Sequence, residues 1–241
     1  MKIGNTSISW ECGSQRGHFF TEEFKDHLPK LVKRFSKSKW WVASVLGSQK
    51  NRMRKYLQGV HFHWVELADV PGEFAYQKNF GIDRALNIYA VRVAKEFPAV
   101  IIDCGTAITI EFIDFEGAHQ GGWITPGVRL QIEALHKKTD ALPAFKFKQP
   151  LNRWGRSTKD CMNAGIFSQL TATIESARQI AEEYCGKKVN LILTGGWART
   201  FSTPSTRYRG RLVFEALSHL AKQKVADERS SSTLRRSRHR T

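Results

Sequence analysis

Residues 99–113 read AVIIDCGTAITIEFI, and this stretch decides the fold class. Two apolar, β-branched runs are interrupted at Asp103, Cys104 and Gly105. Such runs around a short break with a glycine predict a strand, a tight turn and a second strand. Asp103 ends the first run, where an unpaired carboxylate would be costly, so we expect it either to bind a cation or to accept backbone hydrogen bonds within the hairpin.

Extended and helical patterns alternate on both sides of this hairpin. Residues 123–125 are expected to form a further strand, and apolar residues at helical spacing follow Thr21, Asp83 and Thr158. This alternation predicts an α/β protein, and a strand that turns at a glycine opens each half. The expected division is a first lobe over residues 1–98, a second lobe over 99–226 and a basic disordered tail over 227–241.

The chain is strongly basic, since 38 Lys and Arg against 22 Asp and Glu give a formal net charge of +16. A charge of this size attracts polyanions such as nucleotides and nucleic acids. Part of the excess lies in the stretch DERSSSTLRRSRHRT from Asp227 onward, which has almost nothing to bury. Because no zinc finger or RNA-recognition signature accompanies the charge, we expect weak nonspecific contact with nucleic acid through the tail; specific binding is the alternative.

The composition predicts a cytoplasmic globular protein without a membrane anchor. Of the 241 residues, 41% are hydrophobic, which is enough for one or two cores. No apolar run reaches the length of about 18 residues that a membrane span needs, and the opening MKIGNTSISWEC lacks the apolar centre of a secretory signal. The four cysteines are scattered without a C-x-x-C pair, so a reducing cytoplasm is expected.

Two glycine turns are candidates for phosphate binding. Gly4, Asn5 and Thr6 follow the first strand pattern, and Gly105 with Thr106 follows Asp103. A glycine lets the backbone approach a ligand closely, and its N–H groups together with a threonine hydroxyl can cradle a phosphate. Most such turns are only turns, so each one alone is a weak signal.

Asp83 and Arg84 are the candidates for chemistry on a hydroxyl substrate. An aspartate at a helix start is commonly a cap, and an adjacent arginine is commonly a surface charge. In a kinase, however, an aspartate accepts the proton of the attacking hydroxyl or orients it. Arg84 would then hold a substrate carboxylate through two parallel hydrogen bonds.

Taken together and in order, the motifs resemble type III pantothenate kinases over residues 1 to about 222. The motifs are GNT (4–6), GIDR (81–84), DCGTAIT (103–109), GGWITPG (121–127), GRSTKDCMNAG (155–165) and LTGG (193–196). The resemblance implies two ribonuclease-H-like lobes, as in the actin and sugar-kinase superfamily. It also implies phosphorylation of pantothenate with ATP, Mg²⁺ and a monovalent cation, K⁺ or NH4⁺, by a homodimer.

The resemblance also assigns roles to individual residues. Asp83 matches the proton acceptor, and Asp103 matches the ligand of the monovalent cation. The residues that match pantothenate contacts are Tyr76, Gly81, Ile82, Asp83, Arg84 and Thr158. The residues that match ATP contacts are Gly4, Asn5, Thr6, Thr106, Gly195 and Gly196.

The first motif departs from the family pattern D-x-G-N-T, because Lys2 stands where the aspartate is expected. A lysine ammonium can bind phosphate as a point charge but cannot ligate Mg²⁺. Three interpretations follow: a misassigned start, a shortened chain, or activity that is reduced or rerouted. A catalytically impaired relative with a regulatory or nucleic-acid-binding role is therefore the alternative to an active kinase.

Overall fold

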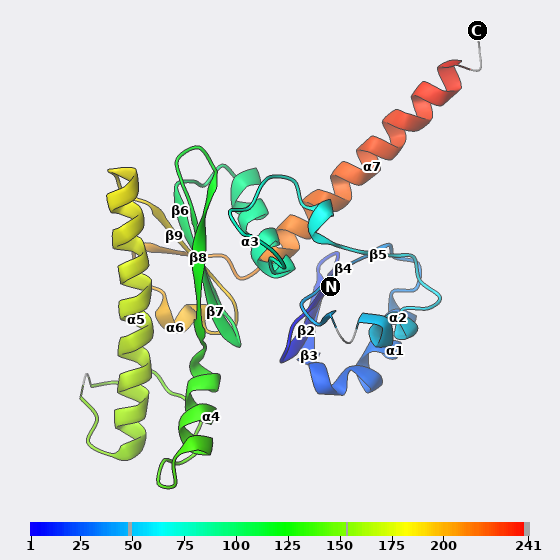
Figure 1. Cartoon of the computed structure of the whole chain (residues 1–241). Helices are drawn as coiled ribbons and strands as arrows, with labels where there is room; N and C mark the ends of the chain where they lie inside the picture. Colours follow the sequence, from blue (N-terminus) through cyan, green and yellow to red (C-terminus); the bar gives the residue numbers. More distant parts are fainter. Residues whose placement is uncertain (48–49, 153, 239–241) are drawn as a thin grey trace. The chain divides into compact units, whose positions relative to one another are not determined.

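The computed structural model describes residues 1–47, 50–152 and 154–238 and contains two compact units. Unit 1 comprises Met1–Gly72, Asn79–Ala90 and Leu212–Thr241, and unit 2 comprises Glu73–Lys78 and Val91–Arg211. Each unit contains one five-stranded sheet (Figure 1). Among the described residues, no helix combines the length and apolar character that crossing a bilayer requires.

The sheet of unit 1 has the strand order β3-β2-β1-β4-β5. Its strands are β1 (Lys2–Ile3), β2 (Ser7–Cys12), β3 (Gln15–Phe20), β4 (Trp40–Ser44) and β5 (Phe62–Trp64). The pairs β1–β2 and β2–β3 are antiparallel, while β4 runs parallel to both β1 and β5. The helices are α1 (Phe24–Arg34), α2 (Lys50–Tyr56), the first part of α3 (Ile82–Val93) and α7 (Leu212–Arg238), with 3-10 turns at Thr21–Glu23 and Leu67–Asp69.

The sheet of unit 2 repeats this plan, with the order β8-β7-β6-β9-β10 when it is read from β8. Its strands are β6 (Ala99–Cys104), β7 (Ala107–Ile113), β8 (His119–Pro126), β9 (Asn190–Thr194) and β10 (Thr206–Tyr208). Again the first three strands are antiparallel neighbours and the last two are parallel to β6. The helices are α4 (Val128–Lys138), α5 (Thr158–Cys185) and the short α6 (Ala198–Phe201).

The shared topology confirms the predicted mixed α/β fold with two ribonuclease-H-like lobes. The hairpin expected at residues 99–113 is present as β6 and β7, with Asp103 opposite Thr109. Each sheet packs its apolar face against helices of its own unit. Ile3, Ile8 and Leu28 are fully buried in the core of unit 1, and Ile102 and Leu193 in the core of unit 2.

Helix α7 differs in two ways from the sequence expectation. It belongs to unit 1, whereas residues 212–226 were expected in the second lobe. Its apolar side is buried there, and the Tyr89 hydroxyl on α3 contacts His219 Nδ1 at 2.8 Å and donates to Gln223 Oε1 at 2.8 Å. The helix also continues to Arg238, where a disordered tail was expected from residue 227. Extending an existing helix requires no new nucleus, which favours this continuation.

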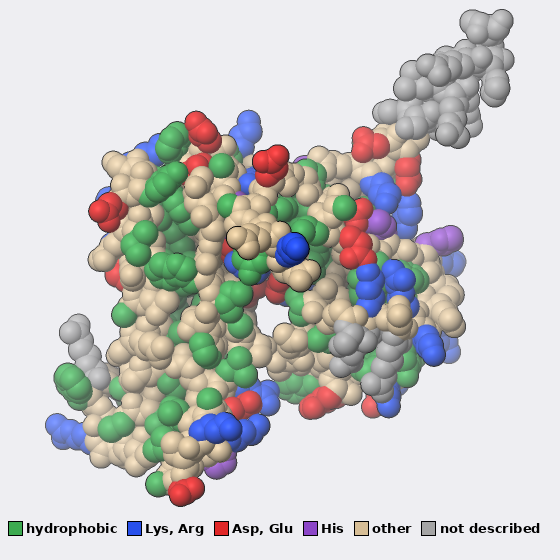
Figure 2. Space-filling model, viewed as in Figure 1, with side chains coloured by type: hydrophobic (Ala, Val, Ile, Leu, Met, Phe, Trp, Pro, Cys, Tyr) green, Lys and Arg blue, Asp and Glu red, His purple; other side chains and the backbone are tan. Residues whose placement is uncertain are grey.

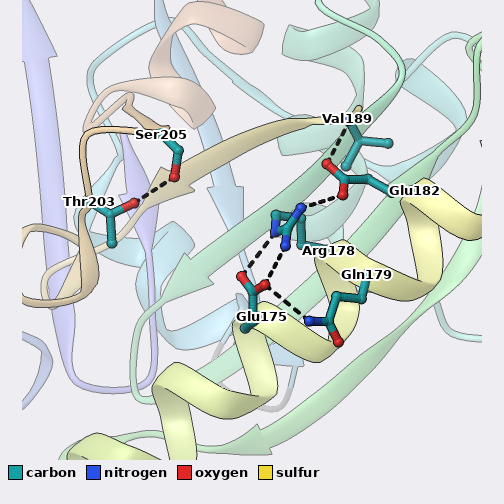
Figure 3. A network of polar contacts seen from close by, with 7 residues as sticks. All are labelled: Glu175, Arg178, Gln179, Glu182, Val189, Thr203 and Ser205. Carbon is teal, nitrogen blue, oxygen red and sulfur yellow. Dashed lines mark hydrogen bonds and ion pairs between the residues drawn. The ribbon is translucent and has the colours of Figure 1, made fainter. Parts of the chain in front are cut away.

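Helix α5 is tied to the strand that follows it by a charged network. Arg178 donates to the carboxylates of Glu175 and Glu182, and the Val189 N–H donates to Glu182 Oε1 at 3.4 Å (Figure 3). The hydrogen bonds from Arg178 lower the pKa of Glu175 and outweigh the opposing effect of burial. The network therefore fixes the end of α5 against the entry to β9 and stabilises unit 2.

Candidate functional site

Asp103 lies where the carboxyl ends of two parallel strands meet in unit 2. It is the last but one residue of β6, only 7% of its surface is exposed, and its register partners are Thr109 and Thr194. Gly195 follows β9 directly and has φ +90°, a conformation that side-chain-bearing residues rarely adopt. A Cβ on Gly195 would lie 2.4 Å from Asp103 Oδ1, so only glycine allows this loop to pack on the carboxylate.

Three loops of unit 2 meet around this carboxylate. A Cβ on Gly127, which follows β8, would lie 2.4 Å from the carbonyl oxygen of Thr106 and 2.5 Å from that of Gly105. The Gly127 N–H donates to the Thr106 carbonyl at 3.0 Å, and the Trp197 N–H donates to the Cys104 carbonyl at 3.0 Å. The turns after β6, β8 and β9 therefore form one packed cluster, which we call the glycine cluster.

The glycine cluster is suited to holding a cation and phosphate groups. The carboxyl ends of strands in an α/β sheet are the usual location of ligand sites, and turns with exposed backbone N–H groups bind anions. A Cβ on Gly196 would meet no atom within 4 Å, so the space beside this glycine is open. Burial, and secondarily Asp103, raises the pKa of the Cys104 thiol to about 12, so this thiol stays protonated and is not a nucleophile.

Gly127 is the member of this cluster that the sequence analysis did not assign to a site. The sequence does mark this residue, because Gly127 is the last residue of the motif GGWITPG. The sequence could not show that the chain returns at this point to the β6–β7 turn. The pairing of Ala107 with Pro126 brings the two loops together.

In unit 1 the other glycine turn joins β1 to β2. The Gly4 N–H donates to the Ser7 carbonyl at 2.9 Å, which closes the turn. Thr21 holds the turn from outside, because its hydroxyl donates to the Gly4 carbonyl at 2.8 Å and its N–H donates to the Thr6 carbonyl at 2.9 Å. Asn5 is exposed and Thr6 is half-buried, so the tip of the turn presents polar groups to solvent.

The residues of the GIDR motif lie together at the start of α3 in unit 1. Asp83 is half-buried in the first turn, and its Oδ1 accepts the N–H of Arg84 at 2.9 Å. The guanidinium of Arg84 is buried and lies 4.6 Å from the centre of the Phe80 ring, which fixes its direction. A Cβ on Gly81 would lie 3.0 Å from Asp83 Oδ1, so glycine leaves room for this carboxylate.

Tyr76 and Thr158 come from other elements of unit 2. Tyr76 lies in the loop 73–78 with 47% of its surface exposed, and its N–H donates to the Phe74 carbonyl at 2.7 Å. Thr158 is the exposed first residue of α5, directly after Ser157, whose hydroxyl caps the helix by accepting the Asp160 N–H at 3.2 Å. Of the site residues predicted from the sequence, the structure brings Asp103, Thr106 and Gly195 together in the glycine cluster of unit 2.

Comparisons with known proteins agree with the motifs. The family model of type III pantothenate kinases matches residues 1–179. A type III pantothenate kinase of Flavobacterium johnsoniae is 32% identical over 208 residues, which are 80% of this chain and 83% of the relative. One from Phocaeicola vulgatus is 31% identical over 74% of this chain and 75% of its own.

Among solved structures, a Campylobacter jejuni protein named as a Baf family transcriptional activator has a TM-score of 0.69 to this chain. The similarity covers 93% of this chain and 98% of that protein at 21% identity. At this level of identity the structural similarity establishes the fold.

Proposed function

The chain belongs to the type III pantothenate kinase family, and we propose that it transfers the γ-phosphate of ATP to the terminal hydroxyl of pantothenate. The product is 4′-phosphopantothenate, and the reaction is the first step of coenzyme A synthesis. The observation that carries this proposal is the glycine cluster around Asp103, because the family's motifs DCGTAIT, GGWITPG and LTGG all contribute to it. Thr106, Gly195 and Gly196 contact ATP there, and Gly4, Asn5 and Thr6 supply the phosphate turn of the first lobe.

Asp83 accepts the proton of the pantothenate hydroxyl or orients it for in-line attack on the γ-phosphorus. Its position in the first turn of α3, with Oδ1 fixed by the Arg84 N–H at 2.9 Å, supports this role. Arg84 holds the pantothenate carboxylate, and its stacking on Phe80 supports a fixed orientation before substrate arrives. Gly81, Ile82, Tyr76 and Thr158 complete the pantothenate contacts.

The residues of the glycine cluster fit the cations that the reaction requires. Asp103 offers a nearly buried carboxylate, and the glycine at position 195 lets the backbone of the β9 loop approach it closely. We assign Asp103 to the monovalent cation, K⁺ or NH4⁺. Mg²⁺ characteristically binds through one or two carboxylates together with substrate phosphates and water, and it neutralises phosphate charge during transfer.

The active form is a homodimer in the cytoplasm. β8 is an edge strand of its sheet, and it exposes 40% of Trp123 and 60% of Ile124. Hydrophobic side chains also lie on the surface in view over α5 and β8 (Figure 2). An apolar sheet edge of this kind is a favourable surface for a second copy of the chain. All four cysteines are free thiols, which fits a reducing compartment.

One coupled assay tests the proposal. The purified chain is supplied with pantothenate, ATP and Mg²⁺, and ADP release and phosphopantothenate formation are both followed, with K⁺, NH4⁺ or Na⁺ as the only monovalent cation. We expect product with K⁺ or NH4⁺ and a loss of that cation dependence in Asp103→Asn. If no phosphopantothenate forms with any of these cations, the proposed activity is wrong.

A further inference from the structure

A carboxylate–imidazole pair is buried in the sheet of unit 2 on the strands β7 and β8. Glu111 Oε2 and His119 Nε2 lie 3.0 Å apart, and the two side chains are 1% and 0% exposed. A Cβ on Gly122 would lie 2.5 Å from Glu111 Oε2, so the second glycine of GGWITPG leaves room for the carboxylate. Because burying two polar groups is costly, the pair requires a reason beyond filling the sheet.

The second ring nitrogen of His119 provides such a reason. His119 Nδ1 accepts the N–H of Ala75 at 3.1 Å. Since Nδ1 is an acceptor, the ring proton lies on Nε2 and is donated to Glu111. The pair therefore orients one acceptor towards the backbone of the loop 73–78, which contains no helix or strand.

Arg92 on α3 holds the same loop at a second point. Its Nη2 donates to the Glu73 carbonyl at 2.9 Å, and its Nε donates to the Gly117 carbonyl at 2.7 Å. The Arg92 guanidinium lies 5.4 Å from the centre of the Phe74 ring, and the same ring packs edge-on at 6.3 Å from His119. Residues 73–75 are thus fixed on unit 2 by side chains, directly before Tyr76.

We propose that Glu111 and His119 are positioning residues that set the place of Tyr76 for pantothenate. This inference rests on the proposed function, in which Tyr76 contacts that substrate. The pair does not touch the reacting atoms; it fixes the Ala75 N–H, and through one residue of backbone it fixes the partly exposed Tyr76. A pair that only filled the sheet would need no contact with the loop, and apolar residues of similar volume would replace it without a change in substrate affinity.

The test replaces both partners at once, because each one helps to compensate the burial of the other. In Glu111→Leu/His119→Leu the Ala75 N–H loses its acceptor, and we expect the KM for pantothenate to rise about tenfold while the KM for ATP stays within about twofold. Glu111→Gln retains an acceptor oxygen for the His119 Nε2–H, so the ring keeps its orientation towards Ala75 and most of the affinity should remain. Glu175→Gln, which weakens the network on α5, is the matched control and should leave both KM values unchanged.

A double-mutant cycle then locates the effect. In a Tyr76→Ala background, the leucine pair should raise the KM for pantothenate no further, because the residue that it positions is gone. An equal rise in both backgrounds, or an unchanged KM for pantothenate in the leucine pair, overturns the proposal.

Hydrogen exchange separates this outcome from failure of the proposed activity. The amide of Ala75 should exchange at least about tenfold faster in the leucine pair than in the parent. If the parent chain does not phosphorylate pantothenate, the proposed function fails, and the exchange rate still decides whether the pair holds the loop. An unchanged rate at Ala75 means that it does not.

Discussion

Gly195→Ala is the substitution that most directly probes the packing around Asp103. The new Cβ would lie 2.4 Å from Asp103 Oδ1 and 2.7 Å from the carbonyl oxygen of Cys104. The carboxylate could rotate, but the Cys104 backbone belongs to the central strand β6 and cannot move without disturbing the sheet. The substitution also forces a residue with a side chain to adopt φ +90°.

Both effects have known sizes. A residue with a side chain in a positive-φ conformation costs about 1–2 kcal/mol, and overpacking of a close-packed site typically costs about 1–3 kcal/mol. The sum is about 2–5 kcal/mol. For a chain of 150–250 residues each kcal/mol lowers Tm by about 2–4 °C, so a loss of about 3 kcal/mol corresponds to about 6–12 °C.

The neighbouring glycine is the control. Gly196→Ala places its Cβ where no atom lies within 4 Å, so its free energy of unfolding should stay within about 0.5 kcal/mol of the parent. Thermal unfolding followed by circular dichroism, together with urea unfolding, compares the two variants. If Gly195→Ala is as stable as Gly196→Ala, then the loop after β9 does not pack closely on Asp103, and the reasoning is refuted.

Three further predictions concern single side chains. Asp83→Asn retains the acceptor for the Arg84 N–H, so Tm should change little, while kcat falls by about 10²–10⁴ in the coupled assay; an active variant would remove Asp83 from the mechanism. Lys2→Asp should raise kcat/KM by about an order of magnitude, the size of one charge-assisted interaction; equal values in variant and parent would contradict this. Because Arg178 lowers the pKa of Glu175, the charged carboxylate stabilises the fold above its ordinary pKa of 4.5, and this contribution is lost as the pH falls through the lowered value. Glu175→Gln should therefore reduce stability in urea at about pH 7, and the difference from the parent should shrink steadily as the pH falls below 4.5; a difference that does not change with pH would speak against the linkage.

The parts of the fold that were predictable from sequence depend on neighbours along the chain. The β6–β7 hairpin was recognisable because two β-branched runs flank a turn of a few residues. The helix that begins at the GIDR motif was recognisable because its apolar residues recur at helical spacing. In both cases the physical cause of the structure lies within about fifteen residues of sequence.

The parts that were missed depend on contacts between distant segments. β8 was expected only over residues 123–125 but begins at His119. The prediction was too short because glycine has a low strand propensity, and Gly121 and Gly122 therefore weaken the strand pattern in the sequence. Gly121 adopts a positive φ beside the bulge in β8, and Gly122 leaves room for the Glu111 carboxylate of the neighbouring strand β7. The contact of Ala75 with His119 joins residues that are 44 positions apart, and no local sequence pattern predicts it.

The repeated topology makes Lys2 and Asp103 counterparts in the two lobes. Each lies on the central strand of its sheet, two residues before the glycine of the following turn. Their register partners also correspond: Lys2 lies opposite Ser9 and Ala43, and Asp103 lies opposite Thr109 and Thr194. The departure from the family motif is therefore a change of charge at one of two duplicated positions.

Under the proposed function, this change of charge alters how the first turn would meet phosphate. A carboxylate at this position attracts a cation, which in turn attracts phosphate, whereas an ammonium attracts phosphate directly. Under the proposed function, Asp103 would act through a cation, whereas Lys2 would contact phosphate directly. A direct ammonium contact neutralises one charge but cannot bridge two phosphate oxygens as a metal ion does, which is the physical reason to expect a functional yet slower enzyme rather than an inactive one.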